Sequence, residues 1–275
     1  MLIRPAPGAL VWPAAMVVWG PGVSSTEHSH HSVQLVMTIR GSLRVRGPGR
    51  PWRECGAVLV RPDAPHEVVA LGETVVIAFV EPESELGAAL CDRIARDIVC
   101  VSPSVVARWR AALGTPLTDE SVERWVSRQL LRRRRPVAVD RRVAEVLALV
   151  RRQLGAQQDL SLKALAARAG VSPSRLMHLF TQSLGVPLRP YILWLRLQRA
   201  ACELMAGATV TKAAHRAGFA DAAHLTRTFR RMLGVTPSDM ALRKRASRGL
   251  SVETPPRRIE RTPPDGRPDH ELTRA

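Results

Sequence analysis

The chain has 275 residues, of which 45% are hydrophobic, and a formal net charge of +17 at pH 7. This length suffices for two domains with separate cores, and the hydrophobic content excludes a chain that is disordered throughout. The excess charge lies in one half, because residues 1–131 hold 13 Lys+Arg and 13 Asp+Glu, whereas residues 132–275 hold 28 and 11. A neutral part joined to a strongly basic part predicts a polyanionic partner, either nucleic acid or an anionic membrane.

A membrane is the less favoured of these two partners. The sequence has no window of about 18 consecutive apolar residues, which a spanning helix requires. The N-terminal stretch is interrupted by Pro5, Pro7 and Pro13, and no signal peptide is recognisable. The four cysteines lack the spacing of a metal site or a CxxC motif, which is typical of free thiols in a reducing compartment. We therefore expect a cytoplasmic protein without membrane association.

Residues 1–85 have the pattern of a β-rich domain. Valine-rich runs such as "SVQLVMTIRGSLRVRG" and "TVVIAFV" are separated by Gly and Pro. Short apolar runs bounded by such turn residues predict strands that are joined by hairpins.

Four polar side chains of this β-rich part fall into a two-part pattern. The segments "EHSHHSVQLVMTIRG" and "GAVLVRPDAPHEV" contain His28, His30, Gln34 and His66. The pattern resembles that of cupins, in which side chains at these positions converge on a metal inside a small β-barrel. Gln34 stands where the usual ligand is a carboxylate. The resemblance implies a cupin-like barrel, which in regulators serves as an effector sensor.

Strand alternation argues against a metal at these four residues. His28, His30 and Gln34 share one face of a strand, but Val33 and Leu35 have the opposite parity. A bulge near Ser32 would be needed to bring both sets to the same face. We therefore expect no cofactor and interpret the four as effector-binding or ordinary pocket residues, with a metal site as the less favoured alternative.

From residue 86 the apolar spacing becomes helical. "SVVARWRAAL" and "DESVERWVSRQLL" each have one apolar and one charged face. We expect the helical segment 86–138 to couple the β-rich domain to the rest of the chain, or to form a homodimer through the helices around Trp109 and Trp125. The alternative is that these helices only pack on the barrel. The run Arg132–Arg135 is more typical of a solvated helix end than of a DNA contact.

The third part, residues 139–245, contains one phrase twice. "AGVSPSRLMHLF" ends at Phe180 and "AGFADAAHLTRTF" ends at Phe229. Each copy predicts a helix, a turn at a glycine and a second helix, with Ser172 and Asp221 as N-caps of the second helices. The apolar segment "RPYILWLRLQRAACELM" between the copies predicts a long spacer helix. Two helix-turn-helix units about 34 Å apart could read two successive segments of a DNA major groove.

At about 100° per residue, the outward faces of both second helices are polar or basic and carry no acidic residue. The outward positions of the first are Ser174, His178, Thr181 and Gln182. Those of the second are Ala223, Arg227, Arg230 and Arg231. Such faces are typical of helices that enter the major groove.

Residues 141–242 resemble the DNA-binding domain of the AraC family of bacterial transcription regulators. The resemblance rests on "LSLKALAARAGVSPSRLMHLF" and "AAHRAGFADAAHLTRTFRRMLGVTPSDM" together, and the chain departs from the family pattern at Met240 and Ala241. It implies double-stranded DNA, a small-molecule effector and RNA polymerase as partners. It also implies base contacts from residues that flank the buried Leu of each recognition helix, namely Ser174, Arg175 and His178 in the first copy, and Ala223, His224 and Arg227 in the second. Gln182 completes the predicted DNA-binding set, with Arg230 and Arg231 as phosphate contacts.

The predicted fold is therefore multidomain: a β-rich cupin-like barrel followed by an all-α domain with two helix-turn-helix motifs. Residues 246–275 have too little apolar content to pack and are expected to form a basic disordered tail. The predicted function is a sequence-specific DNA-binding transcription regulator, not an enzyme. One alternative is a cupin metalloenzyme, an oxygenase or isomerase, fused to a DNA-binding module. The other is a non-specific nucleic-acid binder that acts through the tail.

Overall fold

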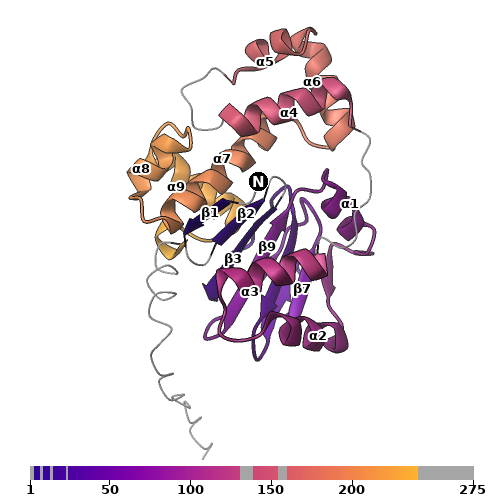
Figure 1. The fold of residues 1–275 in the computed structure, drawn as a ribbon, viewed down its shortest axis with the longest axis vertical. Helices are drawn as coiled ribbons and strands as arrows, with labels where there is room; N and C mark the ends of the chain where they lie inside the picture. Colours follow the sequence, from indigo (N-terminus) through magenta and orange to yellow (C-terminus); the bar gives the residue numbers. More distant parts are fainter. Residues whose placement is uncertain are drawn as a thin grey trace, which may run out of the picture.

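The computed structural model describes residues 3–6, 9–12, 15–22, 24–130, 139–153 and 160–240. A sheet-rich N-terminal region (residues 3–130) precedes a helical C-terminal region (residues 139–240), as the sequence predicts (Figure 1). The run Arg132–Arg135 and the tail 246–275 lie outside the described residues. Among the residues that are described, no helix is both long and apolar enough to span a membrane.

The N-terminal region consists of two antiparallel sheets. The larger has the order β1 (Ile3–Ala6), β2 (Ala9–Trp12), β3 (Ala15–Pro21), β9 (Thr74–Val80), β4 (Val33–Thr38), β7 (Ala57–Val60) and β10 (Ile98–Cys100). The smaller has the order β6 (Arg53–Cys55), β5 (Leu43–Arg46) and β8 (Glu67–Val69). Valines from both sheets, including Val36, Val45 and Val58, fill the space between them.

The expected barrel is not closed within the described residues. Strands β5, β6 and β8 form ladders only with one another, and beyond these ladders there are, among the described residues, only the isolated bridges Ser24–Val69 and His28–His66. Three such short strands are too few to complete a continuous ladder around the core. The region is therefore a sandwich of two sheets.

Three helices and a π-helix cover the outer face of the larger sheet. They are α1 (Glu85–Cys91), α2 (Pro103–Leu113), α3 (Asp119–Trp125) and η1 (Val126–Leu130). Leu35 and Met37 of β4 pack against this layer together with Trp125, which is 1% exposed. Segment 86–138 also contains β10, which sequence periodicity missed because three residues are too short to show alternation.

The C-terminal region has the predicted double helix-turn-helix arrangement. Its helices are α4 (Arg141–Gln153), α5 (Leu162–Arg168), α6 (Pro173–Leu184), α7 (Leu188–Met205), α8 (Val210–Arg216) and α9 (Ala222–Leu233). The turns at Gly170 and Gly218 adopt positive φ, which favours glycine. The side chains of Ser172 and Asp221 accept hydrogen bonds from the third residue beyond them, so both predicted N-caps are confirmed.

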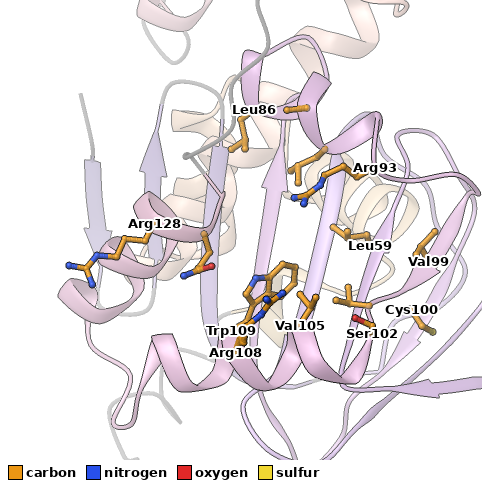
Figure 2. Close-up of a pocket in the computed structure, with 14 residues that line it drawn as sticks. Leu59, Leu86, Arg93, Val99, Cys100, Ser102, Val105, Arg108, Trp109 and Arg128 are labelled. Atoms are coloured by element: carbon orange, nitrogen blue, oxygen red, sulfur yellow. The ribbon is translucent and has the colours of Figure 1, made fainter.

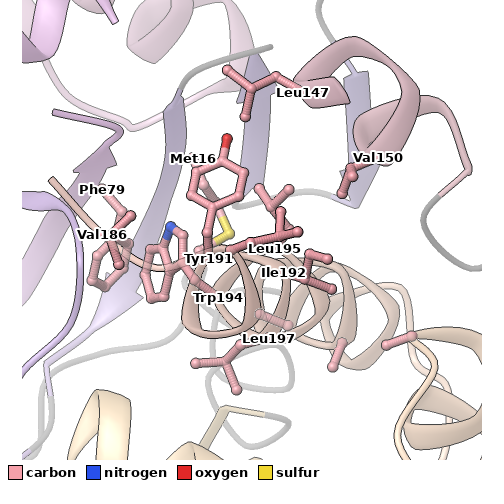
Figure 3. Close-up of a cluster of buried hydrophobic side chains, with 14 of the residues drawn as sticks. Met16, Phe79, Leu147, Val150, Val186, Tyr191, Ile192, Trp194, Leu195 and Leu197 are labelled. Carbon is pink, nitrogen blue, oxygen red and sulfur yellow. The ribbon is translucent and has the colours of Figure 1, made fainter. Parts of the chain in front are cut away.

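Helix α7 joins the two halves of the molecule. Tyr191 and Trp194 are fully buried in a cluster that includes Met16 and Phe79 of the sheet and Leu147 of α4 (Figure 3). A polar contact lies beside this cluster, where Arg151 of α4 binds Glu81 and the Tyr191 hydroxyl lies 3.1 Å from the same carboxylate. Burial of these groups makes the two regions one packed body.

A second carboxylate, that of Glu83, is buried at this junction. The Glu83 side chain is 4% exposed, and neither of its oxygens has a hydrogen-bond partner among the described residues, although His31 Nε2 lies 3.9 Å from its Oε2. Burial raises the pKa of Glu83, and burial also raises the pKa of Glu81 to about 7 despite the opposing charge of Arg151. The folded state therefore binds more protons than the unfolded state, and stability is lost as the pH rises through about 7.

Replacement of Glu83 by Gln removes the buried charge and should flatten this pH dependence. We expect Glu83→Gln to raise the free energy of unfolding by about 1 to 3 kcal/mol at about pH 8, and to have a smaller effect at about pH 5, because the raised pKa of Glu83 favours the uncharged carboxyl as the pH falls. Denaturant unfolding at both pH values measures this. The exposed carboxylate variant Glu27→Gln is the control, and an equal effect of Glu83→Gln at both pH values would contradict the account.

Candidate nucleic-acid interface and histidine cluster

The second helices of the two helix-turn-helix units, α6 and α9, present their predicted outward faces to solvent. Leu176 and Leu225 are fully buried, and each anchors its helix against the helix that precedes it. Neither α6 nor α9 contains an acidic residue. The two units lie at opposite ends of α7, so this helix sets the distance between the faces (Figure 1).

Eight of the nine predicted DNA-binding side chains are exposed. They are Ser174, Arg175, His178 and Gln182 on α6, and Ala223, Arg227, Arg230 and Arg231 on α9. The ninth, His224, is half-buried, and its ring lies 5.2 Å from that of Phe219, edge to face. His224 therefore packs within its own helix-turn-helix unit, which sequence periodicity did not indicate.

The N-terminal histidines converge. His28, His30 and His66 are at most 6% exposed, and one ring nitrogen from each lies within 4.8 Å of the other two. Gln34 joins them, because its Oε1 lies 2.7 Å from His66 Nε2. The expectation from strand alternation that these side chains do not converge was wrong, because β4 is buried on both faces. Gln34 faces the interior between the sheets, whereas Val33 and Leu35 face the helices.

The other ring nitrogen of each histidine has a hydrogen-bond partner. His28 Nδ1 lies 2.8 Å from the Thr26 carbonyl, His66 Nδ1 lies 2.9 Å from the Ala64 carbonyl, and His30 Nδ1 lies 2.9 Å from Ser32 Oγ. Burial lowers the pKa of all three imidazoles, to about 4 for His66, and the neighbouring histidines lower the pKa of His30 further. The cluster is therefore neutral at physiological pH and offers lone pairs.

The C-terminal region covers this cluster. A cavity of about 50 Å³ beside His28 and Gln34 is lined by Leu233, Val235 and Met240. Gly234, the left-handed C-cap of α9, accepts a hydrogen bond of 2.9 Å from the Thr26 amide. Sequence reasoning missed this contact because no local pattern signals a contact between residues 208 positions apart.

A larger groove lies on the outer face of the sheet, between α1, α2 and η1. Its volume is about 800 Å³, and its apolar lining includes Leu59 of β7, Leu86 of α1 and Val105 of α2 (Figure 2). Trp109 of α2 lines the groove, and the arginines at its edges are Arg93, Arg108 and Arg128. The helices around Trp109 and Trp125 thus pack on the sheet, and dimerisation through them stays a prediction.

Comparison with known proteins assigns the C-terminal region. Residues 165–243 match the family model of a helix-turn-helix domain. No curated protein matches the chain. A transcriptional regulator from Chromobacterium violaceum, described as an AraC-type DNA-binding domain-containing protein, is 28% identical over 38% of this chain and 91% of its own, with a TM-score of 0.35.

The fold of most of the chain is similar to that of ToxT from Vibrio cholerae. An apo ToxT structure has a TM-score of 0.52 at 13% identity, covering 84% of this chain and 97% of that chain. A structure of ToxT with a bound unsaturated fatty acid has a TM-score of 0.50 at 11% identity, covering 84% and 95%. The C-terminal region of this chain is therefore a helix-turn-helix domain by its match to the family model, and it follows a sheet-rich region in a two-part fold similar to that of ToxT.

Proposed function

We propose that the chain is a sequence-specific DNA-binding transcription regulator whose N-terminal region binds a small-molecule effector. The observation that carries this proposal is the pair of exposed recognition faces without acidic residues, held on one buried helix. Two such faces on a rigid spacer suit two successive segments of one major groove.

The side chains on the two faces have different roles in this proposal. Arg227 is exposed on α9, where a guanidinium can form two hydrogen bonds with a guanine. Ala223 offers only a methyl contact, whereas Ser174, Arg175 and His178 can reach base edges from α6. Arg230 and Arg231 lie in the last turn of α9 and contact phosphates.

We infer that the chain is a binding protein and not an enzyme, because the C-terminal region covers the histidine cluster and leaves only a small cavity beside it. The cavity beside it holds about 50 Å³, far below the roughly 300 to 1,000 Å³ of a typical organic ligand site. An organic substrate has no room there while α9 is in place. RNA polymerase is the further partner that a transcription regulator requires, and the proposal places the protein in the cytoplasm.

The coupling between effector and DNA would pass through the junction of the two regions. The contact of Gly234 with Thr26 and the packing of Trp194 against the sheet both join recognition elements to the N-terminal core. A ligand that shifts one sheet against α7 therefore shifts both helix-turn-helix units. The histidine cluster lies at this junction and is the first candidate for its site, provided that the ligand is an ion or a molecule of a few atoms that fits the cavity of about 50 Å³.

The outer groove is the second candidate for an effector site, and its chemistry fits an amphipathic carboxylate. Its apolar lining suits an aliphatic chain, and Arg93, Arg108 and Arg128 suit an anionic head group. The fatty acid that is bound to ToxT belongs to this class of ligand.

The DNA-binding proposal predicts two distinguishable arginine phenotypes. Arg227→Ala should cost about 1 to 3 kcal/mol of discrimination at one base position while leaving non-specific binding in place. Arg231→Ala should weaken binding to all sequences alike and lower the slope of log affinity against log salt by about 1. Binding isotherms on a specific and a scrambled duplex at several salt concentrations measure both effects. If both variants behave like the wild type on both duplexes, the recognition faces are wrongly assigned.

The groove proposal predicts a change in the fluorescence of Trp109. Titration with a long-chain fatty acid should shift the emission of the wild type, and the shift should disappear in Trp109→Phe. Arg93→Ala should weaken the apparent affinity about two- to fivefold because the arginine is exposed. The exposed arginine variant Arg50→Ala, in the turn between β5 and β6, should bind normally. A shift that persists in Trp109→Phe would place the ligand elsewhere.

A further inference from the structure

Two buried carboxylates at the junction of the two regions share one arginine. Glu81 directly follows β9, Glu83 lies two residues further along the chain, and their side chains are 2% and 4% exposed. Arg151, in the last turn of α4, binds Glu81. Within the described part of the chain, no lysine or arginine forms a salt bridge with Glu83. The pair therefore has two acidic groups and one positive partner from the C-terminal region.

The other groups that face the pair come from α7 and from the segment before β4. The Tyr191 hydroxyl donates a hydrogen bond of 3.1 Å to Glu81 Oε2. His31 Nε2 lies 3.9 Å from Glu83 Oε2, and His31 Nδ1 lies 2.8 Å from the Asp63 carboxylate. Because that carboxylate can only accept, the neutral imidazole has its proton on Nδ1 and presents a lone pair to Glu83. The charge of an ionised Glu83 is therefore not compensated by this ring.

The protonation of the pair depends on whether α4 and α7 are docked. Burial raises the pKa of Glu81, Arg151 lowers it and the charge of Glu83 raises it again, which brings it to about 7. Burial also raises the pKa of Glu83. If the helices leave the sheet, water reaches both carboxyls, and each pKa returns toward its ordinary value of 4.5. Near neutral pH the docked form therefore holds about one proton that the separated form releases.

We infer that the Glu81–Glu83 pair is a proton-dependent contact: its protonation strengthens the docking of α4 and α7 on the N-terminal sheet, and this docking strengthens specific DNA binding. The inference rests on the proposed function, because it takes the docked arrangement as the one that reads DNA. Docking is most favourable below about pH 4.5, weakens as the pH rises to about 7 and is constant above that value. Between these limits, one proton changes the docking equilibrium by up to about tenfold per pH unit.

The pair reaches the DNA-binding helices because one carboxylate holds two of them. Glu81 bonds to Arg151 of α4 and to Tyr191 of α7, whose ring extends toward Leu147 of α4 (Figure 3). Helix α4 packs on α6, the recognition helix of the first helix-turn-helix unit, and α7 continues to the second unit. Loss of this contact allows the first unit to move relative to α7. The two faces are then no longer held at one spacing, and DNA binding must order them again.

Tyr191 offers a spectroscopic probe of the pair. It is the only tyrosine in the sequence. Burial raises the pKa of its hydroxyl, so the phenol stays protonated while the carboxyls titrate. Full-length protein labelled with ¹³C at the tyrosine Cζ atom should give one resonance, and its chemical shift should titrate with a midpoint at about pH 7. A chemical shift that stays constant between about pH 5 and pH 8.5 overturns the inference.

Glu83→Gln tests whether the pair, and not Glu81 alone, sets this midpoint. The substitution keeps the shape of the side chain and removes one acidic group, so Arg151 is left with a single carboxylate. The midpoint of the Tyr191 resonance should then fall by at least about one pH unit. Asp97→Asn, which removes an exposed carboxylate between α1 and β10, is the control and should keep the midpoint of the wild type. An unchanged midpoint in Glu83→Gln overturns the role of the pair.

The second experiment measures DNA affinity on a duplex that the full-length wild type selects from a random pool. At about pH 6 the wild type and Glu83→Gln should bind it nearly equally, and at about pH 8 Glu83→Gln should bind about 3- to 10-fold more tightly. Comparison of the two proteins at the same pH cancels the titration of His178 and His224, which both proteins contain.

The outcomes separate this inference from the proposed function. Equal affinities of the two proteins at about pH 8 overturn the coupling to DNA, and weaker binding by Glu83→Gln overturns the assignment of the docked form as the one that binds DNA. A difference of the same size at both pH values overturns control by protons. If neither protein prefers any sequence, the proposed function is wrong, whereas the titration of the Tyr191 resonance still tests the carboxylate pair.

Discussion

The burial of α7 against the N-terminal sheet is the interaction on which the rest of the structure depends. Tyr191 and Trp194 fill a core that the sheet shares through Met16 and Phe79, while the ends of the same helix carry the two helix-turn-helix units. Close-packed interiors transmit displacements instead of absorbing them. A movement of the sheet would therefore reposition both helix-turn-helix units together, which is the route by which the proposed effector would act on DNA binding.

Polar contacts at the same junction determine the position of α7 against the sheet. Arg151 of α4 binds Glu81 of the N-terminal region and lies 2.9 Å from the Tyr191 hydroxyl of α7. These contacts fix the position of α4 and α7 relative to the N-terminal region. The contact between Thr26 and Gly234 fixes the far end of α9 in the same way. These groups lose their partners if the regions separate, which costs more than the loss of apolar contact alone.

The sequence predicted what depends on local patterns. The glycine turns, the N-caps Ser172 and Asp221 and the apolar stripe of α7 follow from helical spacing and capping chemistry, and all are present. The sequence did not predict features that depend on contacts between segments far apart along the chain. Alternation in β4 was misread because a layer of helices buries the outer face of the sheet, so apolar side chains do not mark the interior. The barrel was expected from a two-part motif, which indicates the convergence of four residues but not the closure of a sheet.

The central claim is that one chain reads two groove segments at a spacing set by α7. Selection of bound sequences from a random duplex pool by the full-length protein at physiological salt tests this most directly. The account predicts a recovered motif of two short blocks about one helical turn apart. Enrichment of DNA without any shared motif, or with a single block, would contradict it.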